Sequence, residues 1–243
     1  MTAPVFVINM ETCKERFDAT YERLMQSQVV ATRFNATVGK ALTSEELSHW
    51  YDAAANRRYY HRDLTLGEVG CYISHMRVWQ KVVEESIPYA IVLEDDLHIE
   101  PSFTTILNQI EQLSNWDMIK LSDNRANPFF QQQPLDEGFT LGNYRKVPNG
   151  TQGYAISLSG AKKLLQRKPF FRPVDVDIQF HSEVNLNLLG IKPYAISEDL
   201  GFESEISKLN KGKHSNRSTF LRNLKHRIRM YLERKKTSGQ LPS

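Results

Sequence analysis

The spacing of apolar and polar residues predicts an α/β fold that opens with a buried strand. Residues 5–8 form an unbroken apolar run rich in β-branched side chains, which is typical of a strand covered on both faces. Residues 12–28 follow with Phe17, Tyr21 and Leu24 at helical spacing. A strand that leads directly into a helix is typical of nucleotide-binding α/β domains, although no Gly-x-Gly-x-x-Gly sequence is present.

The same patterns predict further elements along the chain. Strands are expected at residues 32–36, 89–93, 117–121, 153–157 and 192–196, and helices at 44–55, 66–83, 101–113, 159–167 and from the 175–177 region to 189. Thr65 and Glu68 form a capping box at the start of one helix. Residues 56–63 and 122–137 are expected to be loops near a binding cleft, and Gly142 with Asn143 is expected to turn a hairpin.

Three carboxylates follow the predicted strand at residues 89–93. Glu94, Asp95 and Asp96 stand where that strand should leave the core, and in open α/β sheets ligands bind beyond the carboxyl ends of strands. Adjacent acids repel one another, so a hard divalent ion with oxygen ligands is the expected occupant. The alternative is a solvated polar turn. Strand alternation would direct Glu94 and Asp96 to one side and Asp95 to the other.

Charge and composition change this picture mainly at the C-terminal end. The 243 residues carry a net charge of +3, yet residues 208–243 hold eleven Lys and Arg against one acid. We therefore predict a catalytic domain over 1–207 and a basic tail over 208–243. Cys13 and Cys71 form no pattern typical of disulfides or of a cysteine metal site. The first residues show no leader pattern and no bilayer-length apolar run, so we expect a cytoplasmic protein.

The tail contains a predicted basic amphipathic helix over residues 219–236. Its apolar residues recur every three or four positions, and Lys and Arg occupy much of the remaining circumference. Such a helix can lie in the interface of an anionic membrane, where each basic residue contributes on the order of 1 kcal/mol. It can also pack on the acidic body of the protein. We favour peripheral attachment to the cytoplasmic face of the inner membrane.

Several stretches together resemble one enzyme family. They are Leu66-Gly-Glu-Val-Gly-Cys-Tyr-Ile-Ser-His-Met76 with Trp79, Ile91-Val-Leu-Glu-Asp-Asp96, and Gly153-Tyr-Ala-Ile-Ser157 with Ala161-Lys-Lys-Leu-Leu165. This set is similar to glycosyltransferase family 25, which comprises bacterial lipooligosaccharide galactosyltransferases related to collagen galactosyltransferases. The resemblance spans roughly residues 4–206, and Val7-Ile8-Asn9 with Arg16 resembles the family's first strand and helix.

The resemblance implies a GT-A-like, single Rossmann-type domain with a basic helical extension. It implies an inverting transfer of a hexose, most simply galactose from UDP-galactose, onto a lipooligosaccharide or lipopolysaccharide core saccharide, with Mn²⁺ or Mg²⁺ at an Asp-x-Asp-type motif. The sequence has Glu94-Asp95-Asp96 in place of that motif. We expect Asp96 to be the principal metal ligand, assisted by Glu94 or Asp95, with His214 as a third candidate from the tail.

Inversion also needs a base that takes the proton of the acceptor hydroxyl. Asp175 and Asp177 precede a predicted helix whose N-terminal dipole favours their ionised forms, and both remain candidates. His75 is a further candidate by resemblance. The residues expected to bind the donor are Asn9, Arg16, Glu68, Glu94, Asp95, Lys120, Gly153 and Tyr154.

Two other function classes use similar features. Clustered acids on an α/β sheet also serve metal-dependent nucleotidyl- and phosphotransferases, although no Gly-x-x-x-x-Gly-Lys-Ser/Thr loop is present. The basic tail alone would suit a nucleic-acid-binding protein, but the acidic body argues against a nucleic-acid groove, so no nucleic-acid partner is expected.

Overall fold

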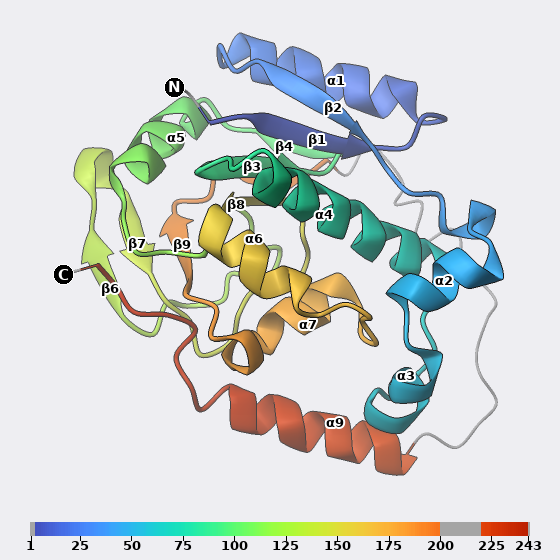
Figure 1. Cartoon of the computed structure of the whole chain (residues 1–243). Coiled ribbons are helices and arrows are strands. Elements are labelled where there is room, and N and C mark those ends of the chain that lie inside the picture. Colours follow the sequence, from blue (N-terminus) through green and yellow to red (C-terminus); the bar gives the residue numbers. More distant parts are fainter. Residues whose placement is uncertain (1–2, 200–219, 243) are drawn as a thin grey trace.

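The computed structural model describes residues 3–199 and 220–242, and these residues form a mixed α/β domain (Figure 1). The large sheet is built from β1 (Val5–Asn9), β2 (Ala31–Asn35), β3 (Tyr89–Leu93), β5 (Met118–Lys120), β6 (Gln132–Pro134), β7 (Thr140–Gly142), β8 (Gly153–Ser157) and β9 (Leu188–Lys192). A separate two-stranded sheet consists of β4 (Leu97–Ile99) and β10 (Ile196–Glu198).

The helices vary from one turn to five. They are α1 (Lys14–Gln26), α2 (Ser44–Trp50), α3 (Ala53–Tyr59), α4 (Leu66–Glu84), α5 (Phe103–Gln112), α6 (Leu158–Leu165), α7 (Val174–Gln179) and α9 (Phe220–Glu233), with short 3-10 helices at Gly39–Ala41, Asp136–Gly138 and His181–Val184. None of the helices within the described residues is both long and apolar enough to cross a bilayer.

The large sheet has the strand order β2-β1-β3-β8-β5-β9-β7-β6. Strands β2, β1 and β3 are parallel, whereas β8 runs antiparallel to both of its neighbours, β3 and β5. Leu93 at the end of β3 therefore pairs with Gly153 at the start of β8. This register brings the acids that follow β3 next to the loop that precedes β8.

Helices cover both faces of the sheet, as the alternation of side chains along β1 requires (Figure 1). Phe6 and Ile8 contribute to the core beneath α4 and α6, while Val5 and Val7 contribute to the core beneath α1 and α5. Both faces of the central strands are thus buried, which explains why β1 and β3 are continuous apolar runs rather than alternating ones.

The N-terminal half of α4 is fixed in two ways. Thr65 and Glu68 form the predicted capping box. Gly70 allows the backbone of residues 37–39 to cross the helix closely, because a Cβ at Gly70 would stand 2.4 Å from the carbonyl oxygen of Thr37. Ser74 Oγ accepts a hydrogen bond of 2.8 Å from the Thr37 amide on the same side. The next helical residues, Cys71 and His75, are therefore held on a firmly anchored turn.

Most predicted elements of the first 165 residues are confirmed, and the differences lie at three places along the chain. The expected helix at 44–55 is two helices, α2 and α3, and α3 extends into the segment predicted as a loop. No hairpin forms at Gly142 and Asn143, since β7 pairs instead with β6 and β9. The helix predicted to reach residue 189 ends at Gln179, and residues 188–192 form β9.

The described part of the basic tail packs on the domain. The Glu233 carboxylate accepts hydrogen bonds from the Ser182 hydroxyl and amide at 2.8 and 2.9 Å. Beyond α9, the Ser238 amide donates to the Tyr144 carbonyl, and the Ser238 carbonyl accepts from Leu188 at the edge of β9. The predicted boundary at residue 207 lies outside the described residues.

Candidate active site

A cavity of about 230 Å³ lies at the carboxyl end of β3. It is lined by Glu68, Cys71, Glu94, Gly150, Thr151, Gln152, Pro173, Val174 and Asp175. The Glu94 amide donates to the Gln152 carbonyl at 2.9 Å, so the strand end and the loop before β8 form one wall. Three carboxyl groups, those of Glu68, Glu94 and Asp175, share this small volume, at the edge of the sheet where the sequence placed the ligand site.

Glu68 is the most firmly paired of the three acids. Besides its contacts with Thr65, its carboxylate accepts hydrogen bonds from both terminal nitrogens of Arg62, at 2.5 and 2.8 Å. Burial would raise the pKa of Glu68, but the hydrogen bonds from Arg62 and Thr65 outweigh burial and lower it. Glu68 is therefore a fixed negative charge at the rim of the cavity.

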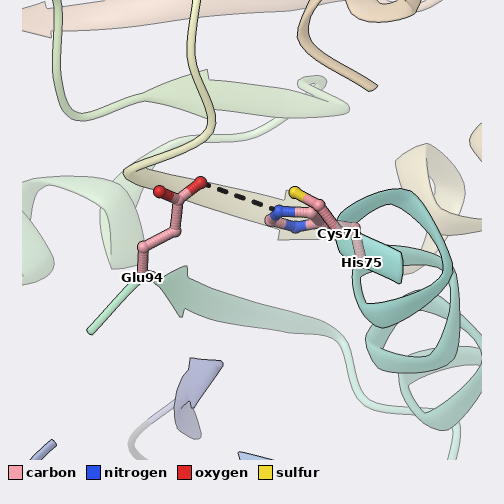
Figure 2. Close-up of side chains that lie close together, drawn as sticks. All are labelled: Cys71, His75 and Glu94. Atoms are coloured by element: carbon pink, nitrogen blue, oxygen red, sulfur yellow. Dashed lines mark ion pairs between the residues drawn. The ribbon is translucent and has the colours of Figure 1, made fainter. Parts of the chain in front are cut away.

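Cys71, His75 and Glu94 meet on one side of the cavity. Figure 2 shows Cys71 and His75 projecting from α4 toward Glu94, and one potential ligand atom from each residue lies within 4.8 Å of the other two. His75 Nε2 is 3.9 Å from Glu94 Oε1. Burial, with a smaller contribution from the Lys120 charge, lowers the pKa of His75 to about 3, so the imidazole is neutral at physiological pH.

The far side of the His75 ring is held by a buried hydrogen-bond chain. The Tyr154 hydroxyl lies 2.8 Å from His75 Nδ1 and accepts a hydrogen bond of 3.0 Å from Trp79 Nε1. Tyr154 was predicted to bind the donor, and in this structure it contacts the histidine and does not line the cavity. A Cβ at Gly153, the residue before Tyr154, would lie 2.5 Å from Cδ1 of Ile196, whose side chain would have to shift.

Glu94 has an unusually basic carboxylate. Burial and the negative charge of Asp96 raise its pKa to about 7, against a hydrogen bond of 2.6 Å from the Thr151 hydroxyl and the positive charge of Lys120. Lys120 is itself buried, which lowers its pKa to about 8, and its Nζ donates to the Gly150 carbonyl at 2.5 Å. A cation is thus held directly behind the loop that lines the cavity.

The other two acids of the triplet are engaged with Arg16. Its Nη2 lies 2.5 Å from Asp95 Oδ1 and 2.7 Å from Asp96 Oδ2, and Asn9 Nδ2 donates to the second oxygen of Asp95 at 2.6 Å. Both side chains are buried. Arg16 was predicted to reach a donor phosphate, and in this structure it stands between the two carboxylates.

This pairing bears on the metal ion that the family resemblance implies. Mn²⁺ and Mg²⁺ require free carboxylate oxygens, but the Arg16 guanidinium already occupies the position between Asp95 and Asp96. Asp95, whose two oxygens are bonded to Arg16 and Asn9, therefore does not fit such an ion, whereas Arg16 contacts Asp96 through Oδ2 alone. Of the other predicted ligands, Glu94 faces the cavity, and His214 lies outside the described residues.

The two predicted base candidates occupy different environments. Asp175 lines the cavity from the first turn of α7, and burial raises its pKa against the backbone hydrogen bonds of Val176 and Gly150. Asp177 points away from the cavity, where its carboxylate pairs with the buried Arg172 and accepts a short hydrogen bond from the Tyr72 hydroxyl. Only Asp175 is placed where a substrate could meet it.

Among the cavity-wall residues that sequence reasoning missed, two have side chains that contact or adjoin Glu94. Cys71 was excluded as a metal ligand because cysteine spacing alone was considered, yet the Cys-x-x-x-His spacing of Cys71 and His75 places both side chains on one helical face. Thr151 gave no local signal, because it reaches Glu94 across 57 positions of sequence.

The mixed sheet with a ligand cavity at its strand ends is that of a GT-A-like, Rossmann-type glycosyltransferase domain. Residues 2–179 match the family model described as glycosyltransferase family 25 (LPS biosynthesis protein). This match covers β1 to α7 and the whole cavity wall. The chain belongs to glycosyltransferase family 25.

Named relatives agree with this assignment. A glycosyltransferase 25 family member of Aedes aegypti is 32% identical over 74% of this chain, and procollagen galactosyltransferase 2 of Mus musculus is 30% identical over 71%. A rat relative of 32% identity is named a probable inactive glycosyltransferase 25 family member. The chain spans less than a third of the length of these relatives, covering 31%, 29% and 31% of them respectively.

Proposed function

We propose that this glycosyltransferase transfers galactose from UDP-galactose to a saccharide of a lipooligosaccharide or lipopolysaccharide core, with inversion to a β linkage. The observation that carries the proposal is the placement of Asp175 in a cavity at the carboxyl end of β3, inside the part of the chain that matches the family. The galactosyl donor is supported by the names of the procollagen galactosyltransferases, and the lipopolysaccharide role by the family description.

The chemistry of this proposal rests on Asp175 as the general base. In a direct displacement the acceptor hydroxyl attacks the anomeric carbon from the face opposite UDP, and a carboxylate takes its proton. The raised pKa of Asp175 suits this task, since a base works best when its pKa approaches the working pH. Lys120 keeps a positive charge near the carboxylates and favours the ionised form of Asp175.

The test is a transfer assay on the full chain. We expect galactosyl transfer from UDP-galactose to core oligosaccharides that lack terminal galactose, with the β configuration assigned from proton coupling constants in the product. Transfer from UDP-glucose alone would reassign the donor. Phosphoryl or nucleotidyl products, or a retained anomeric configuration, would overturn the proposed reaction. A parallel series with EDTA measures whether turnover needs a metal ion.

We further propose that α9 attaches the enzyme to an anionic membrane, where a lipid-linked acceptor would be found. The helix faces the domain with Met230 and Glu233, which are buried, and leaves an apolar stripe open on its outer side. That stripe consists of Leu221, Leu224, Ile228, Tyr231 and Leu232, of which Leu221 is 69% and Tyr231 61% exposed. Exposed Lys and Arg residues flank the stripe, as expected for a helix lying in an interface.

Polar substitutions on the stripe should release the protein from vesicles. We expect Leu224→Gln with Ile228→Gln to weaken cosedimentation with vesicles containing phosphatidylglycerol by about tenfold or more, because each apolar side chain contributes about 1.5 kcal/mol or more when buried. Val30→Gln, which alters an exposed residue of the domain body, is the matched control. Undiminished vesicle binding by the double variant would exclude this role. Truncation at residue 207 is unsuitable, since it removes Glu233 and Ser238 from the domain.

A further inference from the structure

We propose that Cys71, His75 and Glu94 bind a thiophilic divalent metal ion, of which Zn²⁺ is the reference, in the wall of the cavity. The inference goes beyond galactosyl transfer, because it concerns which ion the cavity takes and not which sugar is moved. It rests on four observations: the ligand geometry, the rigidity of the supporting helix, the hydrogen bonds that orient the ligands, and the engagement of the neighbouring acids.

The distances suit a small four-coordinate ion. Bonds of about 2.0 to 2.3 Å to nitrogen, oxygen and sulfur place neighbouring ligands of a tetrahedral Zn²⁺ ion roughly 3.3 to 3.8 Å apart. The observed separation of His75 Nε2 and Glu94 Oε1 is 3.9 Å, and all three ligand atoms lie within 4.8 Å of one another. Closure by no more than about 1.5 Å therefore brings each pair to such a separation.

The backbone already holds these residues in place. Cys71 and His75 are one helical turn apart on α4, and the close crossing at Gly70 fixes that turn against residues 37–39. Glu94 is fixed by the backbone hydrogen bond from its amide to Gln152. Two of the proposed ligands thus come from a helix and one from a strand end, as Figure 2 shows.

Hydrogen bonds orient two of the ligands. A metal bound at His75 Nε2 requires the tautomer with a proton on Nδ1, and this proton would point to the Tyr154 hydroxyl oxygen 2.8 Å away. The Thr151 hydroxyl donates to Glu94 Oε1. Partners of this kind fix the direction of metal-binding side chains and are typical of zinc sites.

The donor set selects the kind of ion. Sulfur and imidazole ligands favour Zn²⁺ or Co²⁺ over Mn²⁺ and Mg²⁺, which prefer oxygen. The nearby oxygen ligands of Asp95 and Asp96 are paired with Arg16. Binding replaces the thiol proton of Cys71 by the metal ion, and the proton is released to solvent. Three protein ligands leave a fourth position open toward the cavity that Asp175 also lines.

Cobalt provides a spectroscopic test without any sugar donor. We expect the full chain to bind one Co²⁺ ion with a thiolate-to-cobalt charge-transfer band and the visible bands of a tetrahedral site, both displaced by Zn²⁺. Cys71→Ser should abolish the charge-transfer band, and His75→Gln should weaken cobalt affinity at least tenfold. Cys13→Ser is the matched control, because it alters the other cysteine of the chain and should leave the spectrum unchanged.

Thermal unfolding supplies a second readout that does not depend on colour. Zn²⁺ at one hundred times its dissociation constant should raise the melting temperature of the wild-type protein and of Cys13→Ser but not of Cys71→Ser. Equal stabilisation of all three proteins, or a charge-transfer band that survives Cys71→Ser, overturns the proposal. So does a wild-type protein that binds neither ion at micromolar concentration. Since neither experiment uses UDP-galactose, a negative result leaves the proposed transfer reaction untouched.

Discussion

Replacing Asp175 by Asn should lower the turnover number for glycosyl transfer by a factor of about 10² to 10⁴, because the amide cannot take the acceptor proton. The Michaelis constant for the nucleotide sugar should change little, since a base that acts on the acceptor makes no contribution specific to donor binding. Steady-state rates of UDP release with saturating acceptor measure both quantities, and calorimetric UDP binding checks the donor site separately.

The matched control for this experiment is Asp177→Asn, two residues further along α7. Asp177 is outside the cavity, so the variant should retain turnover when assayed well below its melting temperature. If Asp177→Asn lost turnover while Asp175→Asn kept it, the base assignment would have to be reversed. Loss of UDP binding in Asp175→Asn would instead place Asp175 in the donor site.

The main effect of Asp177→Asn should be a loss of stability. Its carboxylate neutralises Arg172, which is only 2% exposed, and accepts the Tyr72 hydroxyl in the same buried network. Removing one member of a buried ion pair costs about 3 to 5 kcal/mol of unfolding free energy, and we expect the lower end, because Arg172 keeps Glu183 at 2.6 Å. Urea denaturation at pH 7 measures the difference.

Asp175→Asn should leave the unfolding free energy unchanged or higher in the same experiment. Burial raises the pKa of Asp175 in the folded protein, so the stability that its protonated form provides is lost as pH rises through that pKa. At pH 7 the charged carboxylate of Asp175 therefore lowers the unfolding free energy. Replacement by Asn removes this destabilisation. A fall in stability as large as that of Asp177→Asn would show that Asp175 also belongs to the buried network.

The opposite roles of these two aspartates could not be assigned from the sequence. Positions 175 and 177 are two apart on a helix, so their side chains diverge by about 200° and meet different surroundings. Which one faces the cavity depends on how α7 is docked, and that is set by Arg172, Tyr72 and the loop at Gly150. The sequence could identify the pair as chemically interesting, but choosing between them required tertiary contacts, among them that of Tyr72, which is 105 positions from Asp177.

Local sequence patterns correctly predicted the strands and helix starts that depend on interactions between neighbouring residues. The runs at β1, β3 and β8 and the capping box of α4 are confirmed, because β-branched runs and capping side chains act over a few residues. The end of the helix predicted to reach residue 189 overlaps β9 (Leu188–Lys192), since a short apolar run fits either structure until its neighbours are known. The hydrogen bond between Arg16 and Asp95 joins residues 79 positions apart, so local sequence patterns could not predict it either.

The reversed strand β8 has a consequence for how this chain folds during synthesis. It is inserted between β3 and β5 and pairs with both, so the inner edges of those strands stay open until residue 157 has left the ribosome. Until β8 is synthesised, the unpaired apolar edges of these strands can pair with other chains and cause aggregation. Slower translation between residues 121 and 157 would lengthen that exposure, and holdase chaperones would be needed most over this interval.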